Sequence, residues 1–112
     1  MNNGLYSIHA DLLDGLEGRG SGVLVFRDGR ILGGDAMLYY VGSYTAADGT
    51  VKGEVIVHQH TRIPGVKPLF GGLETSIGFS GKYDDTSATL SGSAFVGKTA
   101  QLFKATLRKL AD

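Results

Sequence analysis

Apolar and polar side chains alternate along the C-terminal half of the chain. Between residues 73 and 83 an apolar or small residue occupies every second position, and segments 87–96 and 101–109 follow nearly the same rule. Because successive side chains of a strand point to opposite faces, a period of two predicts three strands, each with one buried face. The predicted buried set of the first strand is Leu73, Thr75, Ile77, Phe79, Gly81 and Tyr83.

Turn-forming residues divide the whole chain into eight strand-sized runs. These runs span residues 4–10, 20–27, 30–33, 37–45, 50–61, 73–83, 87–96 and 101–109. Two connections contain Asp-Gly, at 28–29 and 48–49, which favours tight hairpins and antiparallel neighbours. Segment 62–72 holds both prolines and is predicted to be irregular, with room for a turn of helix. An amphipathic helix is the alternative for residues 98–111.

Glycine supplies 18 of the 112 residues, without a collagen period. Many of these glycines lie inside the strand-sized runs, where they permit the sharp coiling that a small closed barrel requires. We therefore predict an all-β fold, in which residues 1–112 form a single domain, a small antiparallel up-and-down β-barrel of about eight strands.

The N-terminal half is apolar at consecutive positions, in 23–26 and again in 37–41. Both faces of these strands therefore need cover, although a barrel has one interior. We predict that a second copy covers the outer face and that the protein is a homodimer. The candidate interface residues are Val23, Val25, Met37, Tyr39 and Val41. The alternative is a flattened sandwich in which segment 62–72 covers these strands.

Composition excludes several classes of function. Lysine plus arginine and aspartate plus glutamate number 11 each, so no net field attracts DNA or an anionic membrane. The chain has no cysteine, which excludes thiolate chemistry and cysteine metal sites. No leader peptide or membrane-spanning stretch is recognisable. We expect a cytoplasmic protein that neither binds nucleic acid directly nor enters a membrane.

Several segments of the first 60 residues resemble the GrlR family of negative regulators of bacterial type III secretion. They are GLYSI at 4–8, GSGVLVF at 20–26, DGRILGGD at 28–35, YYVGSY at 39–44 and VIVH at 55–58. The most specific element is the succession of strand, Asp-Gly turn, strand and Gly-Gly-Asp. The resemblance implies a calycin-like or lipocalin-like barrel, a dimer, and an anti-activator that binds a transcriptional activator protein.

The resemblance also implies a partner-binding loop before the fifth strand, where the family carries an acidic Glu-Asp stretch. This chain has Ala46, Ala47, Asp48 and Gly49 there, so only one acid remains. The loop stays the candidate partner-binding site. The contact that the family makes through its acidic stretch does not carry over to this loop, and the sequence does not identify the partner.

Catalytic and metal-binding patterns are weak. His58 and His60 are two apart on a predicted strand and share a face, and a metal would need His9 or Glu54 as a further ligand. Solvent-facing histidines without a metal are the favoured reading. Residues 15–22 are glycine-rich but lack GxxxxGK[ST] and precede a strand rather than a helix.

Two further patterns have structural explanations. Asp84 and Asp85 fall in a turn, where such side chains bond local backbone. Ser21 and Ser43 have no recognisable triad partners. We predict no enzymatic activity, no metal and no cofactor.

The interior of the barrel is the remaining candidate site. Eight strands enclose either packed side chains or one small ligand. Small residues on the apolar faces, such as Gly53, Gly81, Gly92 and Ala94, suit either outcome. The candidate cavity residues are Tyr6, Ile8, Phe79, Tyr83, Leu90 and Phe103. Regulation by protein contact is therefore the first hypothesis, and binding or sensing of a small apolar, lipid-like ligand is the alternative.

Overall fold

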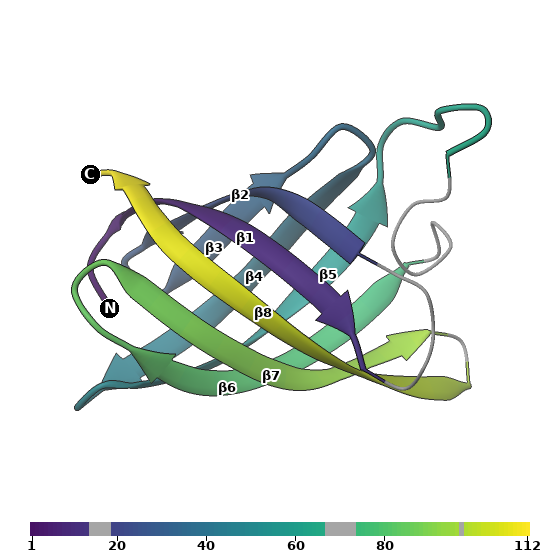
Figure 1. Ribbon diagram of the computed structural model, residues 1–112. Helices are drawn as coiled ribbons and strands as arrows, with labels where there is room; N and C mark the ends of the chain where they lie inside the picture. The colour runs from purple at the N-terminus through teal and green to yellow at the C-terminus, as the bar shows by residue number, and fades with distance from the viewer. Residues whose placement is uncertain (14–18, 67–73, 97) are drawn as a thin grey trace.

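The computed structural model describes residues 1–13, 19–66, 74–96 and 98–112, and the strands in these ranges close into one barrel (Figure 1). Each strand pairs in antiparallel fashion with its neighbours in sequence, and the last pairs with the first. The predicted up-and-down barrel is therefore confirmed. The strands are β1 (Gly4–Leu12), β2 (Arg19–Arg27), β3 (Arg30–Gly34), β4 (Leu38–Ala47), β5 (Thr50–Gln59), β6 (Thr75–Tyr83), β7 (Ser87–Val96) and β8 (Thr99–Ala111).

Two expectations need correction. The helical alternative for 98–111 is wrong, because these residues form β8 and pair with both β7 and β1. The fifth strand ends at Gln59 rather than at residue 61, since the backbone N–H groups of His60 and Thr61 instead donate to the carbonyl of Met37. Segment 62–66 contains a turn closed by Val66 N–H and the Ile63 carbonyl at 3.1 Å. The rest of the predicted irregular segment, 67–72, and residue 73 lie outside the described residues.

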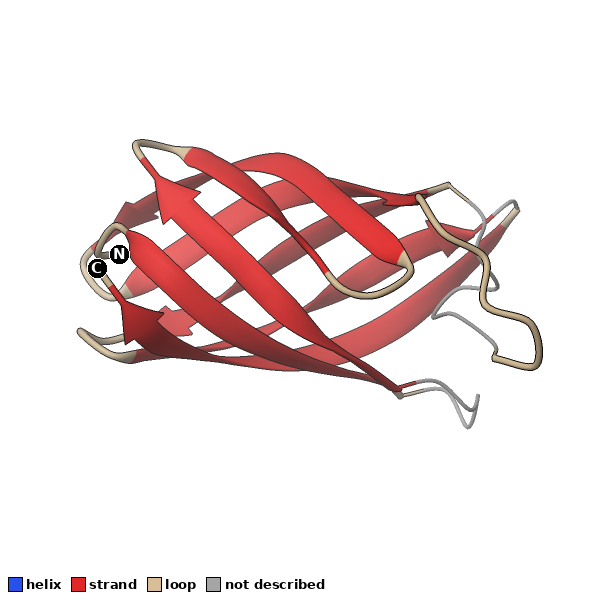
Figure 2. Cartoon of the chain, turned by 90° about the horizontal axis from the view of Figure 1, so that it is seen from above, coloured by secondary structure: helices blue, strands red, loops and turns tan. Residues whose placement is uncertain are grey.

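Both Asp-Gly pairs form the tight turns that the sequence predicts. The φ angles are 49° and 83° at Asp28 and Gly29, and 55° and 80° at Asp48 and Gly49. Positive φ at both central residues is the mark of a type I′ turn, whose twist matches that of the strands it joins. These turns and both chain termini lie at one end of the barrel, here called the turn end (Figure 2). The opposite end, where β4 and β6 begin, is called the loop end.

Inward-facing glycines alternate with large side chains around the barrel wall. Gly42 lies in register between Ile31 and Val55, and Gly92 lies between Phe79 and Phe103. A Cβ on Gly92 would collide with the backbone of Gly78 and Phe79 on the neighbouring strand. These glycines therefore let adjacent strands approach closely and coil, which explains why a chain of this length closes into a narrow cylinder.

The core is aromatic and tightly packed near the turn end. The ring of Phe26 makes edge-to-face contacts with Tyr6, at a centroid distance of 5.3 Å, and with Tyr44, at 5.1 Å. The Tyr6 hydroxyl donates to the Asn2 carbonyl at 2.7 Å, so this fully buried side chain keeps a polar partner. Burial raises the pKa of Tyr6 above its ordinary value. The turn end is thus filled by side chains, and any space for a ligand must lie elsewhere.

Candidate functional site

The outer wall of the barrel carries an apolar row that crosses five consecutive strands. Its members are in register, each beside the next on the adjoining strand: Leu5, Val25, Leu32, Val41 and Ile56. Leu32 is 52% exposed and Ile56 is 41% exposed. Residues that oppose one another across paired strands lie about 4.5–5.5 Å apart, so these side chains form one continuous apolar surface.

A second row runs beside the first, toward the loop end. It places Val23 beside Gly34, Gly34 beside Tyr39, and Tyr39 beside His58. The rings of Tyr39 and His58 stack at a centroid distance of 4.9 Å. Together the two rows form what we call the outer patch. It consists of Leu5, Val23, Val25, Leu32, Tyr39, Val41 and Ile56.

Four of the five predicted interface residues lie in the outer patch: Val23, Val25, Tyr39 and Val41. Met37 lies outside it, in the connection before β4, and is half-buried. Three members were missed, Leu5, Leu32 and Ile56, although each alternates with inward-facing residues: Tyr6 beside Leu5, Ile31 beside Leu32, and Val55 and Val57 beside Ile56. That alternation was the signal that could have identified them.

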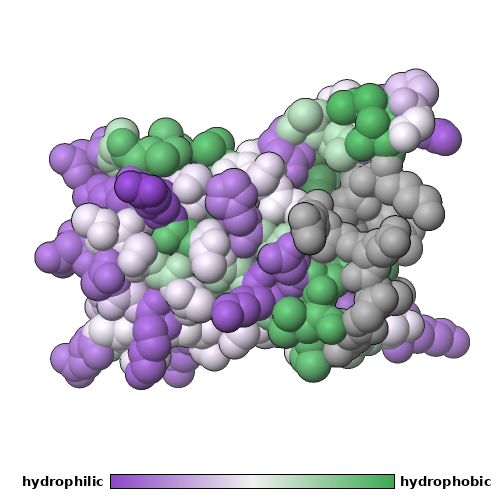
Figure 3. Space-filling view, in the orientation of Figure 1, coloured by the Kyte–Doolittle hydropathy of each residue, from purple (hydrophilic) through white to green (hydrophobic). Residues whose placement is uncertain are grey.

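Nothing in the described part of the chain covers the outer patch. Val23 and Leu32 are 42% and 52% exposed, and a flattened sandwich under the irregular segment would have buried them. Of that segment, residues 62–66 leave the patch open, and 67–72 lie outside the described residues. One edge of this apolar surface is visible over β2 in Figure 3.

A smaller apolar cluster lies where β1 ends and β8 begins, at the lower right of Figure 3. Leu13 and Leu102 are 53% and 48% exposed and are joined by a backbone hydrogen bond of 2.9 Å from Leu13 N–H to the Leu102 carbonyl. Phe95 on β7 is 57% exposed. Ser76 lies between Phe95 and Ile56, so this cluster is separated from the outer patch by a polar residue.

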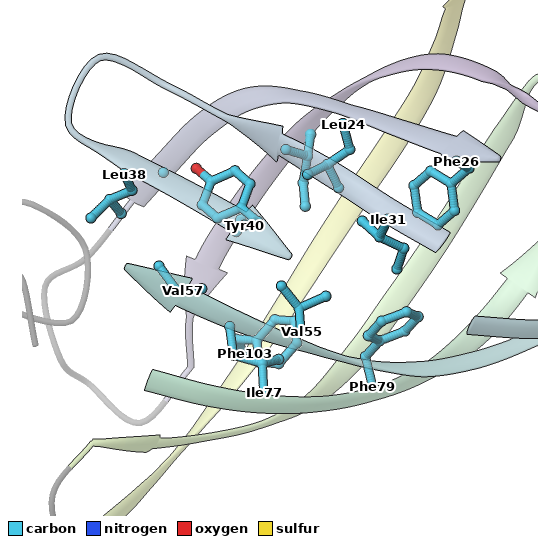
Figure 4. A pocket seen from close by; sticks show the side chains of 13 residues that line it. Leu24, Phe26, Ile31, Leu38, Tyr40, Val55, Val57, Ile77, Phe79 and Phe103 are labelled. Atoms are coloured by element: carbon cyan, nitrogen blue, oxygen red, sulfur yellow. The ribbon is translucent and has the colours of Figure 1, made fainter. Parts of the chain in front are cut away.

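The interior contains a cavity of about 80 Å³ in the half of the barrel near the loop end (Figure 4). Its wall is almost wholly apolar, and the Tyr40 side chain is the one that carries a polar atom. Of the predicted cavity residues, Ile8, Phe79 and Phe103 line this space, whereas Tyr6, Tyr83 and Leu90 belong to the packing outside it. The wall consists of Ile8, Ala10, Gly20, Leu24, Phe26, Ile31, Leu38, Tyr40, Val55, Val57, Ile77, Phe79 and Phe103.

A hydrogen-bonded lock holds the cavity wall at the loop end. The Tyr40 hydroxyl donates to Asp35 Oδ2 at 2.6 Å, and Asp35 Oδ1 accepts from the N–H groups of Met37 and Leu38 at 2.8 and 2.7 Å. The His60 ring contacts the Asp35 carbonyl oxygen at 2.9 Å through Nε2. Burial, reinforced by the bond to Asp35, raises the pKa of Tyr40 well above its ordinary value. Tyr40 therefore remains a neutral donor that fixes the β3–β4 connection.

The predicted partner-binding loop forms the β4–β5 turn at the turn end. Asp48 is exposed there, and the Gly49 carbonyl accepts a 2.9 Å bond from Tyr83 N–H, which ties this turn to the end of β6. The adjoining 84–86 turn contributes two more aspartates. Asp84 Oδ1 accepts from the N–H groups of Thr86 and Ser87 at 2.9 and 2.8 Å, and these bonds lower the pKa of Asp84. The Asp84 side chain thus binds the backbone of its own turn, as predicted.

In the described part of the chain, the metal and catalytic candidates meet in pairs but form no metal site. Among the described residues, no three His, Asp or Glu side chains are grouped closely enough to hold a metal ion. His58 Nδ1 lies 3.9 Å from a Glu74 carboxylate oxygen, while His60 Nδ1 contacts Thr61 Oγ1 at 2.6 Å. On the outer wall His9 lies opposite Ser21, and Ser43 lies opposite Glu54; all four side chains are exposed. Of the glycine-rich segment 15–22, residues 15–18 lie outside the described ranges, and the rest belongs to β2.

Comparison with known proteins identifies no family. No family model matches the chain, and no curated protein matches it. Among solved structures, the ywiB protein from Bacillus subtilis is similar over 96% of this chain and 91% of its own, with 16% sequence identity and a TM-score of 0.38. A similarity of that extent supports no inference about function. In the described ranges, no helix has the length and apolar character needed to cross a bilayer.

Proposed function

We propose that this barrel is a non-enzymatic regulatory protein that acts by protein–protein contact. The observation that carries the proposal is the outer patch, an apolar surface continuous across five strands and uncovered by the described chain. Contiguous exposed apolar surfaces of this kind mark interfaces in soluble proteins. The strands of the closed barrel leave no free edge, so association must use side chains rather than strand addition.

A second copy is the proposed occupant of the outer patch, and a transcriptional activator is the proposed regulatory partner. The resemblance of segments 4–8, 20–26 and 28–35 to the GrlR family supports an anti-activator role. The turn end supplies exposed acids to such a partner: Asp48 in the β4–β5 turn and Asp85 in the neighbouring turn. These two carboxylates take the place of the family's acidic stretch in the proposal, and they favour a partner with a basic surface.

Self-association is tested by the mass in solution of Val25→Lys and Tyr39→Lys. Both side chains point outward, so each variant should fold while placing a charge in the proposed contact. The wild-type chain should elute at twice the chain mass and each variant at the chain mass, measured by size-exclusion chromatography with light scattering. Ser91→Lys, at an exposed position on β7, is the control and should stay dimeric. A wild-type chain that is monomeric at every concentration contradicts this part of the proposal.

Partner binding is tested by affinity capture from the source bacterium with wild type and Asp48→Lys/Asp85→Lys as paired baits. The wild type should retain a DNA-binding activator in stoichiometric yield, and the paired variant should lose it. Arg108→Glu, which changes charge on β8, is the control and should retain it. Capture of the same protein by all three baits would show that the turn end is not the contact.

A second candidate function is the binding of a small apolar ligand, and the interior cavity is the observation that favours it. The volume of about 80 Å³ is well below the roughly 300 Å³ of sites for drug-sized molecules. It therefore suits a single ring or a short alkyl group rather than a whole lipid. The test is xenon binding followed by NMR shifts. Methyl groups of Leu24, Val55 and Ile77 should respond, and those of the distant Leu107 should not.

A further inference from the structure

The strand register fixes which residues can meet if two copies pack through the outer patch. Strands β3, β4 and β5 carry three of the five residues of the apolar row, and the outward residues of these strands lie in three parallel rows. The first row holds Arg30, Ser43 and Glu54. The second holds Leu32, Val41 and Ile56, and the third holds Gly34, Tyr39 and His58. Neighbouring strands are about 4.8 Å apart, so β3 and β5 lie symmetrically on either side of β4.

The charges beside the patch are unbalanced within one molecule. Arg27 and Arg30 oppose each other directly on β2 and β3, an arrangement that is unfavourable for like charges. Glu54 lies two strands away in the same row, next to Ser43 and Gly78. All three charged side chains are exposed, and within the described ranges no ion pair engages any of them. The row is therefore positive at its β3 side and negative at its β5 side.

We infer that the protein dimerises about a two-fold axis that runs along β4, so that Arg30 of each copy pairs with Glu54 of the other. This inference rests on the proposed self-association and adds its geometry. Rotation about that axis exchanges β3 with β5 and keeps each row in place. Leu32 of one copy then faces Ile56 of the other, and Val41 and Tyr39 each face the same residue of the other copy. Gly34 leaves room for the His58 ring of the other copy.

The same rotation forms two Arg30–Glu54 pairs, one at each side of the axis. Because the barrels are convex, contact is closest at β4 and widens toward β3 and β5, where the long arginine and glutamate side chains can bridge the gap. A two-fold axis across the strands is an alternative symmetric arrangement. It would place Arg30 over Gly34, which leaves that guanidinium group without an opposite charge. Arg27 meets no acid with either axis, because it lies over Val23 in this one and over Gly78 in the axis along β4. Charge complementarity therefore favours the axis along β4.

Charge reversal tests the pairing. Arg30→Glu and Glu54→Arg, made singly, each place two like-charged pairs in the dimer, and each should raise its dissociation constant by about ten-fold or more in low salt. Combining both substitutions in one chain restores opposite charges and should return the constant to within about three-fold of wild type. Arg108→Glu carries the same charge change outside the patch and should have no effect. Analytical ultracentrifugation measures each constant, and circular dichroism confirms the fold.

Cross-linking tests the axis independently of charge, since the chain has no cysteine of its own. Residue 43 lies on the proposed axis, so a Ser43→Cys dimer should be joined by a bis-maleimide of about 10 Å span, the usual separation of stacked sheets. Ser91→Cys on β7 is the matched control and should not be joined. With the axis across the strands, the two copies of residue 43 are displaced by roughly 13 Å along the strand and escape cross-linking.

The outcomes separate the geometry from the proposed function. Rescue by the double reversal together with cross-linking at residue 43 supports the axis along β4. A stable dimer that ignores both charge reversals and is not cross-linked at residue 43 overturns that axis and leaves self-association standing. A chain that never dimerises overturns both.

Discussion

At the scale of single residues, Tyr40 shows how one buried hydroxyl organises the loop end. Its bond of 2.6 Å to Asp35 joins β4 to the connection that precedes it. Tyr40→Phe removes the donor and leaves Asp35 Oδ2 without it, so the free energy of unfolding should fall by about 1–2 kcal/mol. Urea denaturation measures the loss. Tyr39→Phe, the adjacent tyrosine whose hydroxyl bonds no described residue, should change stability by less than about 0.5 kcal/mol. Equal losses in both variants would contradict this role for Tyr40.

Asp84 makes the stability of its turn depend on pH. The backbone N–H bonds lower the pKa of Asp84 in the folded chain, so its contribution is present above the unfolded value of about 3.9 and disappears as pH falls through the lower folded value. Asp84→Asn should therefore destabilise the protein near neutral pH and lose that deficit in acid. Urea midpoints of variant and wild type should converge as pH falls below the folded pKa of Asp84. Asp85→Asn, in the same turn but outside this hydrogen-bond set, is the control, and a constant gap for Asp84→Asn would contradict the prediction.

At the scale of elements, the wall of the barrel depends on which way each glycine faces. Gly92 faces inward, and a Cβ there would meet the backbone of β6, whereas Gly78 faces outward with nothing within 4 Å of that position. Gly92→Ala should lower the free energy of unfolding by about 1–3 kcal/mol. Gly78→Ala should raise it by roughly 0.4–1 kcal/mol, because alanine restricts the unfolded chain. Chemical denaturation measures the free energy of unfolding of each variant. Equal changes in both would show that the direction a glycine faces does not affect stability.

Strand positions were predictable because the sequence repeats a local period. Alternation in 73–83, 87–96 and 101–109 correctly assigns the inward residues that the structure describes, such as Ile77, Leu90 and Phe103. The two Asp-Gly turns were equally local, since their φ angles depend on those two residues. Register is less local, because it also depends on the connections between hairpins. The Asp-Gly hairpins align Val25 with Leu32 and Val41 with Ile56, but joining the two pairs into one row depends on the β3–β4 pairing across the 35–37 connection, which no turn motif in the sequence defines.

The same limit explains what was missed in the candidate sites. Tyr6 and Leu90 occupy inward-facing positions, as the cavity residues do. They nevertheless pack outside the cavity, because neighbours from other strands fill the space around them. Tyr40 was not predicted to line it, although its inward position follows from the alternation of β4. The lock between Tyr40, Asp35 and His60 joins three segments, and no single stretch of sequence contains it.

At the scale of the whole molecule, the two candidate functions use different surfaces, and substitutions on β5 can change the cavity alone. Val51 and Val57 both lie on β5 and are both buried, but Val57 lines the cavity and Val51 does not. Val57→Ile adds a methylene group to empty space and should stabilise the protein by up to about 0.8 kcal/mol. Val51→Ile adds the same group to a filled region and should destabilise it by about 1–3 kcal/mol. Thermal and urea unfolding measure both changes.

The decisive comparison is what Val57→Ile does to each function. The substitution reduces the cavity without touching the outer patch or the turn end, so xenon binding should fall while the dimer mass and partner capture stay at wild-type values. Val25→Lys should abolish the dimer mass and leave xenon binding at the wild-type value, because it charges the outer patch and leaves the cavity unchanged. If Val57→Ile also weakens self-association or partner capture, the interior and the outer wall are coupled through the strands they share, and the small apolar ligand becomes a regulator of the contact rather than a separate function.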